Sequence, residues 1–148
     1  MTHVMTESRK KFFDARPESV GQAREFASQV LDGWGLRDRA EDIRLCLSEL
    51  ATNAILHGTA PGHGFLVRLD SGDDVVRLEV HDSRRRRPVV REPDAMDLSG
   101  RGLALVAALS DGWGVEDRAV VGKVVWSCFK TTGAGASTAE QRPRSPRC

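Results

Sequence analysis

The sequence has few of the residues that identify several common classes of protein. It holds three cysteines, Cys46, Cys128 and Cys148, which are far apart and form no CxxC pair. This spacing argues against a disulfide framework and a zinc site, and it fits a reducing cytoplasm. We expect Cys46 and Cys128 to be small buried hydrophobic residues. Tyrosine is absent and aromatic residues make up 5% of the chain, so side chains that stack on nucleic acid bases are scarce.

Long apolar runs and a strong charge bias are also lacking. The longest apolar run, at 103–109, is far shorter than the roughly 18 residues of a membrane span, and the N-terminus has no apolar segment of a secretory signal. Without the tail from Thr131 onward, which holds three Arg and one Glu, the chain has 19 basic and 20 acidic residues. This balance of charges gives no electrostatic reason to expect binding to nucleic acid or to an anionic membrane. We expect a cytoplasmic protein that binds neither directly.

Length and composition predict a single domain with disordered ends. The chain has 148 residues, of which 40% are hydrophobic and 29% charged, enough to bury a core in one domain. Residues 1–9 are polar, and residues 131–148 are rich in Ser, Gly, Pro and Arg, so both ends are expected to be disordered. The domain would span residues 10–130.

Hydrophobic periodicity and turn residues predict the order of elements. The expected elements are a strand at 10–15, helices at 17–32 and 38–57, strands at 65–70 and 75–82, a helix after 102, and strands at 113–118 and 122–130. Asp38 is the expected N-cap of the second helix and Gly58 its C-cap. Short turns between consecutive strands favour antiparallel pairing. We therefore predict a two-layer α/β sandwich (α+β), with a mixed, mostly antiparallel sheet covered on one face by helices.

The second predicted helix carries a polar stripe within the sequence "ELATNAILHG". Glu49, Asn53 and His57 recur every four residues and would lie along one face of a helix. Such a stripe is most often a solvated face. Apolar neighbours such as Leu50 and Ala54 flank it closely, however, and leave little room for a broad solvated face. The pattern therefore favours the rim of a pocket.

Further features suit a nucleotide site when they are combined with this stripe. The Gly-Arg-Gly segment 100–102 precedes a helix, whose free backbone N–H groups suit phosphate oxygens. The Asn53 side-chain carbonyl suits Mg²⁺, and Glu49 would orient a hydroxyl for attack on a γ-phosphate. Asp82 ends a strand, where it can accept a hydrogen bond from adenine N6, and residues 83–98 would form a lid. Each feature alone has a simpler structural explanation.

Together, "SELATNAILHG", "LEVHD", "GRGLALV" and "WG…GKVVW" resemble the N, G1 and G2 boxes of GHKL-type ATPases over about residues 12–130. The closest resemblance is to the anti-sigma-factor serine/threonine kinase branch. It implies a Bergerat-type fold with ATP and Mg²⁺ bound between the long helix and the lid. The implied roles are catalytic base for Glu49, Mg²⁺ ligand for Asn53, pocket wall for His57, adenine reader for Asp82, phosphate binding for Gly100, Arg101 and Gly102, and a further nucleotide contact for Leu103.

The sequence departs from the family pattern at two points. Arg84 stands where the G1 box commonly has glycine, and "GKVVW" lacks the threonine that often lies near adenine. The four arginines 84–87 are more typical of a solvated loop than of nucleic acid binding.

The resemblance implies a kinase that transfers the ATP γ-phosphate to a serine or threonine of an antagonist protein, and that otherwise binds a sigma factor. Homodimerisation follows from the resemblance alone. The two departures leave an alternative open, a catalytically inactive or weakly nucleotide-binding module that regulates a partner by contact alone. A detached histidine kinase catalytic domain is disfavoured by the short lid.

Overall fold

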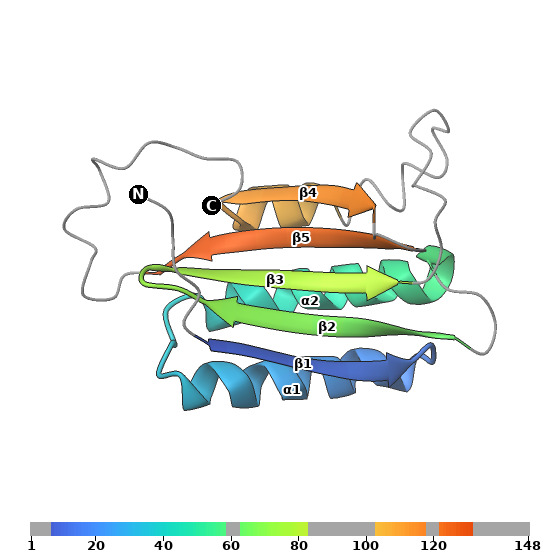
Figure 1. The fold of residues 1–148 in the computed structure, drawn as a ribbon, viewed down its shortest axis with the longest axis horizontal. Helices are drawn as coiled ribbons and strands as arrows, with labels where there is room; N and C mark the ends of the chain where they lie inside the picture. Colours follow the sequence, from blue (N-terminus) through green and yellow to red (C-terminus); the bar gives the residue numbers. More distant parts are fainter. Residues whose placement is uncertain (1–6, 59–62, 83–102, 118–121, 132–148) are drawn as a thin grey trace.

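One antiparallel sheet and the helices on one of its faces make up the described part of the chain (Figure 1). The computed structural model describes residues 7–58, 63–82, 103–117 and 122–131. The elements are β1 (Glu7–Asp14), α1 (Glu18–Gly33), α2 (Ala40–Asn53), the π-helical turn η1 (Ala54–Gly58), β2 (Gly64–Ser71), β3 (Val75–Asp82), β4 (Gly112–Asp117) and β5 (Lys123–Lys130), with a helical stretch at 103–109. Their order is the predicted one.

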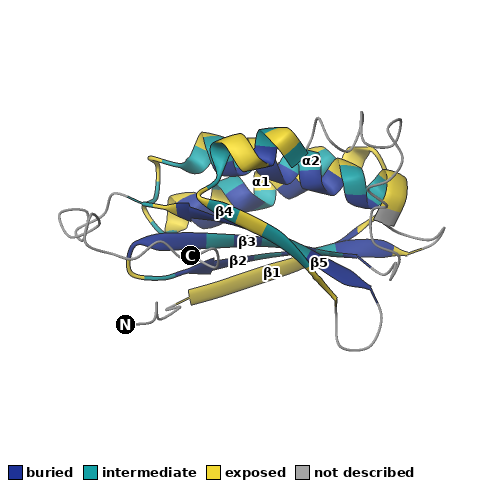
Figure 2. Ribbon diagram, turned by 90° about the horizontal axis from the view of Figure 1, so that it is seen from above, coloured by how far each residue is buried: buried dark blue, intermediate teal, exposed yellow. Residues whose placement is uncertain are grey.

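The strands form a five-stranded sheet in the order β1-β2-β3-β5-β4. All four ladders between described strands are antiparallel. In the hairpin formed by β4 and β5, strand β5 lies next to β3 and pairs with it. Strand β4 is therefore an edge strand of the sheet. Helices α1 and α2 lie over one face of the sheet (Figure 2). The predicted two-layer sandwich is confirmed, with a sheet that is antiparallel throughout these strands rather than mixed.

The core lies between the sheet and the helices because both layers turn an apolar face inward. Alternate residues of β2 and β3 are buried, as period-two alternation requires. The helices supply residues spaced by three or four positions. The main buried cluster includes Ala23, Ala27, Leu31, Ile43, Cys46, Leu47, Leu50, Phe65, Val67, Leu69, Val76, Leu78 and Val80. No helix in the described ranges is both long and apolar enough to span a membrane.

Element ends differ from the prediction at three places. The N-cap of α2 is Arg39 rather than Asp38, and no side chain caps it. The α-helix ends at Asn53, and the residues up to Gly58 form the π-helical turn η1 instead of continuing to a C-cap. Strand β1 begins at Glu7, so residues 7–9 belong to the sheet rather than to a disordered N-terminus.

The two described cysteines are both fully buried but differ in their chemistry. Cys46 is a free thiol. Burial, together with the negative charge of Asp42, raises its pKa to about 12, so it behaves as the small hydrophobic residue that the sequence predicted. Cys128 is disulfide-bonded, which the spacing of the three cysteines did not indicate.

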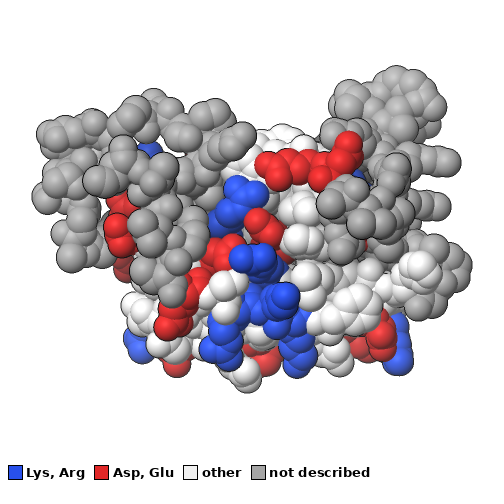
Figure 3. All heavy atoms as spheres, viewed as in Figure 1, with Lys and Arg blue, Asp and Glu red and all other residues white. Residues whose placement is uncertain are grey.

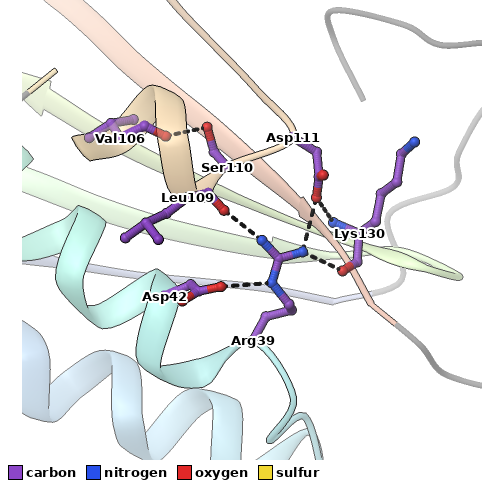
Figure 4. A network of polar contacts seen from close by, with 7 residues as sticks. All are labelled: Arg39, Asp42, Val106, Leu109, Ser110, Asp111 and Lys130. Atoms are coloured by element: carbon purple, nitrogen blue, oxygen red, sulfur yellow. Dashed lines mark hydrogen bonds and ion pairs between the residues drawn. The ribbon is translucent and has the colours of Figure 1, made fainter. Parts of the chain in front are cut away.

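The side chain of Arg39 connects parts of the chain that are far apart in sequence (Figure 4). Its Nε donates to Asp42 Oδ2 at 3.1 Å, and its Nη1 donates to Asp111 Oδ2 at 3.0 Å. The guanidinium also donates to two carbonyl oxygens, those of Leu109 at 2.6 Å and Lys130 at 2.9 Å. Only 20% of the side chain is exposed. Arg39 thus joins the start of α2 to the end of the 103–109 helix and the end of β5.

Two further contacts complete this junction. The guanidinium of Arg39 lies 5.3 Å from the centre of the Phe129 ring, a cation–π distance. The carboxylate of Asp111 also accepts a hydrogen bond from the backbone N–H of Lys130 at 2.7 Å. Because C-terminal helix carbonyls lack partners inside the helix, the bond to Leu109 satisfies one that would otherwise need water.

We expect Arg39→Met to lower the free energy of unfolding by about 2–4 kcal/mol, because it removes several charged donors from partly buried acceptors. Urea denaturation would measure the change. Arg37→Met is the matched control, since the Arg37 side chain is 82% exposed and its ion pair with Asp32 spans 3.8 Å; it should cost less than about 0.5 kcal/mol. Equal midpoints for the two variants would contradict this role for Arg39.

The face of the sheet opposite α1 and α2 carries a mixed cluster of charged side chains (Figure 3). On β3, Arg77 Nε donates to Glu79 Oε2 at 2.7 Å, and His81 Nε2 lies 2.7 Å from Glu79 Oε1. The Arg77 guanidinium lies 4.6 Å from the centre of the Trp126 ring. Gly114 suits its position because an added Cβ would come within 2.9 Å of that ring. Burial alone would raise the pKa of Glu79, but the bonds from His81 and Arg77 outweigh it and lower the pKa to about 2.

We expect Glu79 to make stability depend on pH in the acid range. Its pKa falls from 4.5 to about 2 on folding, so its contribution is fully present above pH 4.5 and is lost as pH falls through about 2. Glu79→Gln should therefore be less stable than wild type at pH 7, by at most about 3 kcal/mol, and the gap should close toward pH 2. Urea denaturation at several pH values tests this, with exposed Glu116→Gln on β4 as control. A gap that does not change with pH would refute it.

Candidate functional site

Two members of the predicted polar stripe lie together on α2. Glu49 and Asn53 are four residues apart, one turn of the helix, and both side chains are half-buried. Within the described ranges, neither side chain takes part in a hydrogen bond or an ion pair. A half-buried carboxylate and amide without partners among the described residues are suited to bind a ligand.

His57 lies beyond the end of the α-helix. It lies in η1, where the π-helical pattern of i to i+5 hydrogen bonds replaces the α-helical one. The His57 side chain is exposed. The first two residues of the predicted stripe therefore share α2, and the role of His57 stays a prediction. π-Turns inside helices occur frequently at functional sites.

A buried ion pair joins the ends of two central strands. Asp82 is the last residue of β3, Lys123 is the first of β5, and the two are partners in the ladder. Lys123 Nζ donates to Asp82 Oδ2 at 2.6 Å. The two side chains are only 7% and 3% exposed, respectively. The attraction offsets the cost of removing both charges from water, but little net stability is expected from such a pair.

The stripe and the ion pair lie at the same end of the molecule. Turn η1, which continues α2, packs against β3 and β2. In Figure 1, η1 lies beside the end of β3 and the beginning of β5. The fold thus brings Glu49 and Asn53 on the helical layer to the end of the sheet that holds Asp82 and Lys123.

Comparison with known proteins gives the family. Residues 13–129 match the family model described as the histidine kinase-like ATPase domain. The chain belongs to the histidine kinase-like ATPase family. The GHKL-type family predicted from the sequence is confirmed, and membership implies that the nucleotide is ATP. No curated protein matches the sequence.

The fold of this ATPase domain is similar to that of a solved structure. The match is to the crystal structure of the RsbU and RsbW domains of Rv1364c from Mycobacterium tuberculosis, with a TM-score of 0.66 and 22% sequence identity. It covers 85% of this chain and 33% of that chain. The chain therefore spans about a third of the protein that it matches, and at this identity the likeness shows the fold.

Part of the predicted site of this ATPase domain lies outside the described residues. That part comprises Gly100, Arg101 and Gly102, the predicted lid 83–98 and the arginines 84–87, whose roles stay predictions. Leu103 is described, and its half-buried side chain packs against the main core. Its predicted contact with nucleotide is untested.

The donors present are compatible with the predicted Mg²⁺. No group of three or more His, Cys, Asp or Glu residues in the described ranges is arranged to hold a metal. Mg²⁺ bound with a nucleotide needs no such group, since water and phosphate oxygens supply most of its six ligands. The half-buried amide of Asn53, next to the half-buried carboxylate of Glu49, fits a single protein ligand of this kind.

Two hollows lined by described residues lie elsewhere. One, of about 370 Å³, lies between α1 and α2 beside Asp32 and Arg44. The other, of about 460 Å³, lies along α1 beside Lys11 and Glu25. Neither includes the stripe or the buried ion pair, so the candidate site rests on the chemistry of its side chains and not on these hollows.

Sequence reasoning identified Asp82 but missed its partnership with Lys123. The sequence analysis treated the lysine as part of the segment "GKVVW" and assigned it no partner. A useful signal was present, since a lysine directly before the largely apolar run "VVWSCF" is unusual for a central strand. The pairing itself depends on the β3–β5 register, which local sequence does not contain.

We expect Lys123→Met alone to lower the free energy of unfolding by about 3–5 kcal/mol, because it removes the cation that offsets the charge of the buried Asp82 carboxylate. Adding Asp82→Asn should recover much of this loss, since neither charge is then buried. Urea denaturation of both single variants and the double variant gives the coupling energy. Lys130→Met, at the exposed end of β5, is the control. Additive effects of Lys123→Met and Asp82→Asn would show that the two side chains do not act as a pair.

Proposed function

We propose that this ATPase domain is an anti-sigma factor that binds Mg²⁺-ATP and transfers the γ-phosphate to a serine or threonine of an antagonist protein. The observation that carries the proposal is the pair of half-buried side chains Glu49 and Asn53, without partners in the described chain, at the helix end beside Asp82. Family membership supports ATP as the donor. The likeness to a structure that contains an RsbW domain supports the anti-sigma branch.

For the proposed phosphate transfer, the protein has to position the reactants and to supply one catalytic base. Asn53 would bind the Mg²⁺, which when bound offsets the negative charge of the phosphates. Glu49 would accept the proton of the substrate hydroxyl while the hydroxyl oxygen forms a bond to the γ-phosphorus. The bond between the γ-phosphorus and the β–γ bridging oxygen breaks, and ADP leaves. Asp82 would accept a hydrogen bond from the adenine N6 amine.

Binding and catalysis would together form a switch between protein partners. The domain would bind a sigma factor or an antagonist protein, and phosphorylation of the antagonist would decide which of them is bound. A cytoplasmic location and a homodimer belong to the same proposal, and they are supported by the resemblance to this branch alone.

The structure also supports a second candidate, a weakly nucleotide-binding module that regulates a partner by contact alone. Asp82, the predicted adenine reader, already accepts a hydrogen bond from Lys123. If a nucleotide has to displace that lysine, its affinity falls. The proposed kinase requires instead that Asp82 accept hydrogen bonds from Lys123 and from the adenine of ATP at the same time.

We expect Asn53→Ala to weaken Mg²⁺-dependent ATP binding by at least about tenfold, since the metal loses its protein ligand. Calorimetric titration with ATP, with and without Mg²⁺, measures this. Glu49→Gln should bind ATP like wild type but should transfer radiolabelled phosphate to a purified antagonist about 10²–10⁴ times more slowly.

Thr52→Ala, an exposed position on the same helix, is the control for both variants and should leave binding and transfer unchanged. If the wild type binds no ATP, the contact-only module replaces the kinase. Unimpaired transfer by Glu49→Gln would show that Glu49 is not the base.

A further inference from the structure

Strand β1 is an edge of the sheet, and one side of its backbone has no partner among the described strands. The backbone N–H of Ala15 donates to the His63 carbonyl, in line with the β1–β2 register. Because bonded pairs alternate along an antiparallel ladder, the odd-numbered residues of β1 direct their backbone groups toward β2. The bond that closes the β2–β3 turn gives the same alternation. Ser8, Lys10 and Phe12 therefore each point an N–H and a carbonyl away from the sheet.

A hollow of about 460 Å³ lies beside this edge, between β1 and the helical layer. It is lined by Lys11 of β1 and by residues of α1 that include Gly21, Gln22 and Phe26. A Cβ built on Gly21 would meet no atom within 4 Å, so the hollow has room for an added side chain. In Figure 1, α1 runs along β1 and extends past it at the edge of the sheet. A further strand at this edge would therefore be covered by α1.

An extended segment would use the edge and the hollow together. Its backbone would bond to the outward groups of Ser8, Lys10 and Phe12, which is the mode of recognition known as strand addition. Since Phe13 lies in the main core, the side chains of the even-numbered β1 residues lie on the face of the sheet opposite the helices. The added segment would likewise direct alternate side chains into the hollow and onto that opposite face.

The charges of β1 indicate what kind of segment fits. The central residues 9–11 are Arg, Lys and Lys, all three are exposed, and they form no ion pair with another described residue. The acidic residues at the ends of the strand have partners, since Glu7 accepts a hydrogen bond from Trp34 and Asp14 lies 3.6 Å from Arg16. The charge that this edge offers to a partner is therefore positive.

Two constraints narrow the choice of partner. Pairing with β1 of a second copy about the same centre would set like charges opposite each other, which is destabilising. An acidic segment would instead place carboxylates beside Lys10, on the face opposite the helices. In the hollow, Lys11 lies with Glu18 and Glu25, so neutral side chains fit there.

We propose that β1 binds an acidic extended segment of a partner protein as a further, antiparallel strand of the sheet. Acidic side chains would lie beside Lys10, and neutral side chains would enter the hollow. This inference goes beyond the proposed function and does not depend on a nucleotide, because neither the edge nor the hollow includes a residue of the candidate site.

The first test uses a short blocked peptide in which valine and glutamate alternate, titrated calorimetrically into the full chain. It should bind at least about tenfold more tightly than the matching valine–lysine peptide. Methylation of the glutamate backbone nitrogens, which donate to β1 in an antiparallel pairing, should abolish binding, and methylation of the valine nitrogens should not. Binding should also slow hydrogen exchange at the amides of Ser8, Lys10 and Phe12, but not at Arg9 and Lys11, which already bond to β2.

Variants of the edge and of the hollow give a second test. Lys10→Pro should weaken binding at least about tenfold, since it removes an outward donor. The ladder with β2 does not use that donor, so the fold should be kept. Lys10→Gln keeps the donor and should cost only about two- to fivefold. Gly21→Met fills the hollow and should weaken binding, whereas Gly33→Met, at the end of the same helix and outside the hollow, should not.

Several outcomes would overturn the inference. These are a glutamate peptide that does not bind, equal effects of the two methylation patterns, and binding that Lys10→Pro and Gly21→Met leave unchanged. Slow exchange at Ser8, Lys10 and Phe12 in the free chain would also overturn it. Sedimentation would then show a dimer if a second copy covers the edge, and a monomer if another segment of the chain does. A failure to bind ATP would count against the proposed function alone.

Discussion

The guanidinium of Arg39 joins the C-terminal half of the chain to the helical layer by polar contacts, in addition to the apolar contacts that Val106 and Phe129 make in the main core. Local hydrogen bonds hold each hairpin and each helix together, but they do not fix how the 103–109 helix sits on α2. Arg39 does so by binding the Leu109 carbonyl at the end of that helix, Asp111 just after it and the Lys130 carbonyl at the end of β5. One planar group with five donors can satisfy acceptors from three segments at once, which lysine cannot.

At the opposite end of the sheet, the charged side chains form a buried ion pair instead. There Asp82 and Lys123 end or begin neighbouring central strands, and each would be costly to bury alone. The two polar residues of α2, Glu49 and Asn53, lie toward the same end because they belong to the last turns of that helix. Polar groups that contribute little to stability are thus gathered at one end, while Arg39 and the apolar core hold the rest. This division is typical of a binding site built on a rigid scaffold.

Much of the fold was predictable because it depends on short-range patterns. The alternation in β2 and β3, the three- and four-residue spacing in α1 and α2, and the turns between strands are all visible over a few residues. The site was predictable in part. Glu49 and Asn53 share a helix face because four residues make about one turn. The change from α- to π-helical hydrogen bonding after Asn53, which places His57 in η1, was not predicted, since no local residue signals it.

The sequence by itself determined the order of elements, the antiparallel hairpins, the apolar face of each helix and the family. All of these follow from spacings of two to four residues or from contiguous motifs. Only the tertiary structure decided that β5 pairs with β3, and hence that Lys123 meets Asp82, 41 positions away in the chain. It likewise decided that Arg39 binds Asp111 and the Lys130 carbonyl. These pairings depend on how the hairpins and helices pack against one another, and no local pattern specifies a partner that distant in sequence.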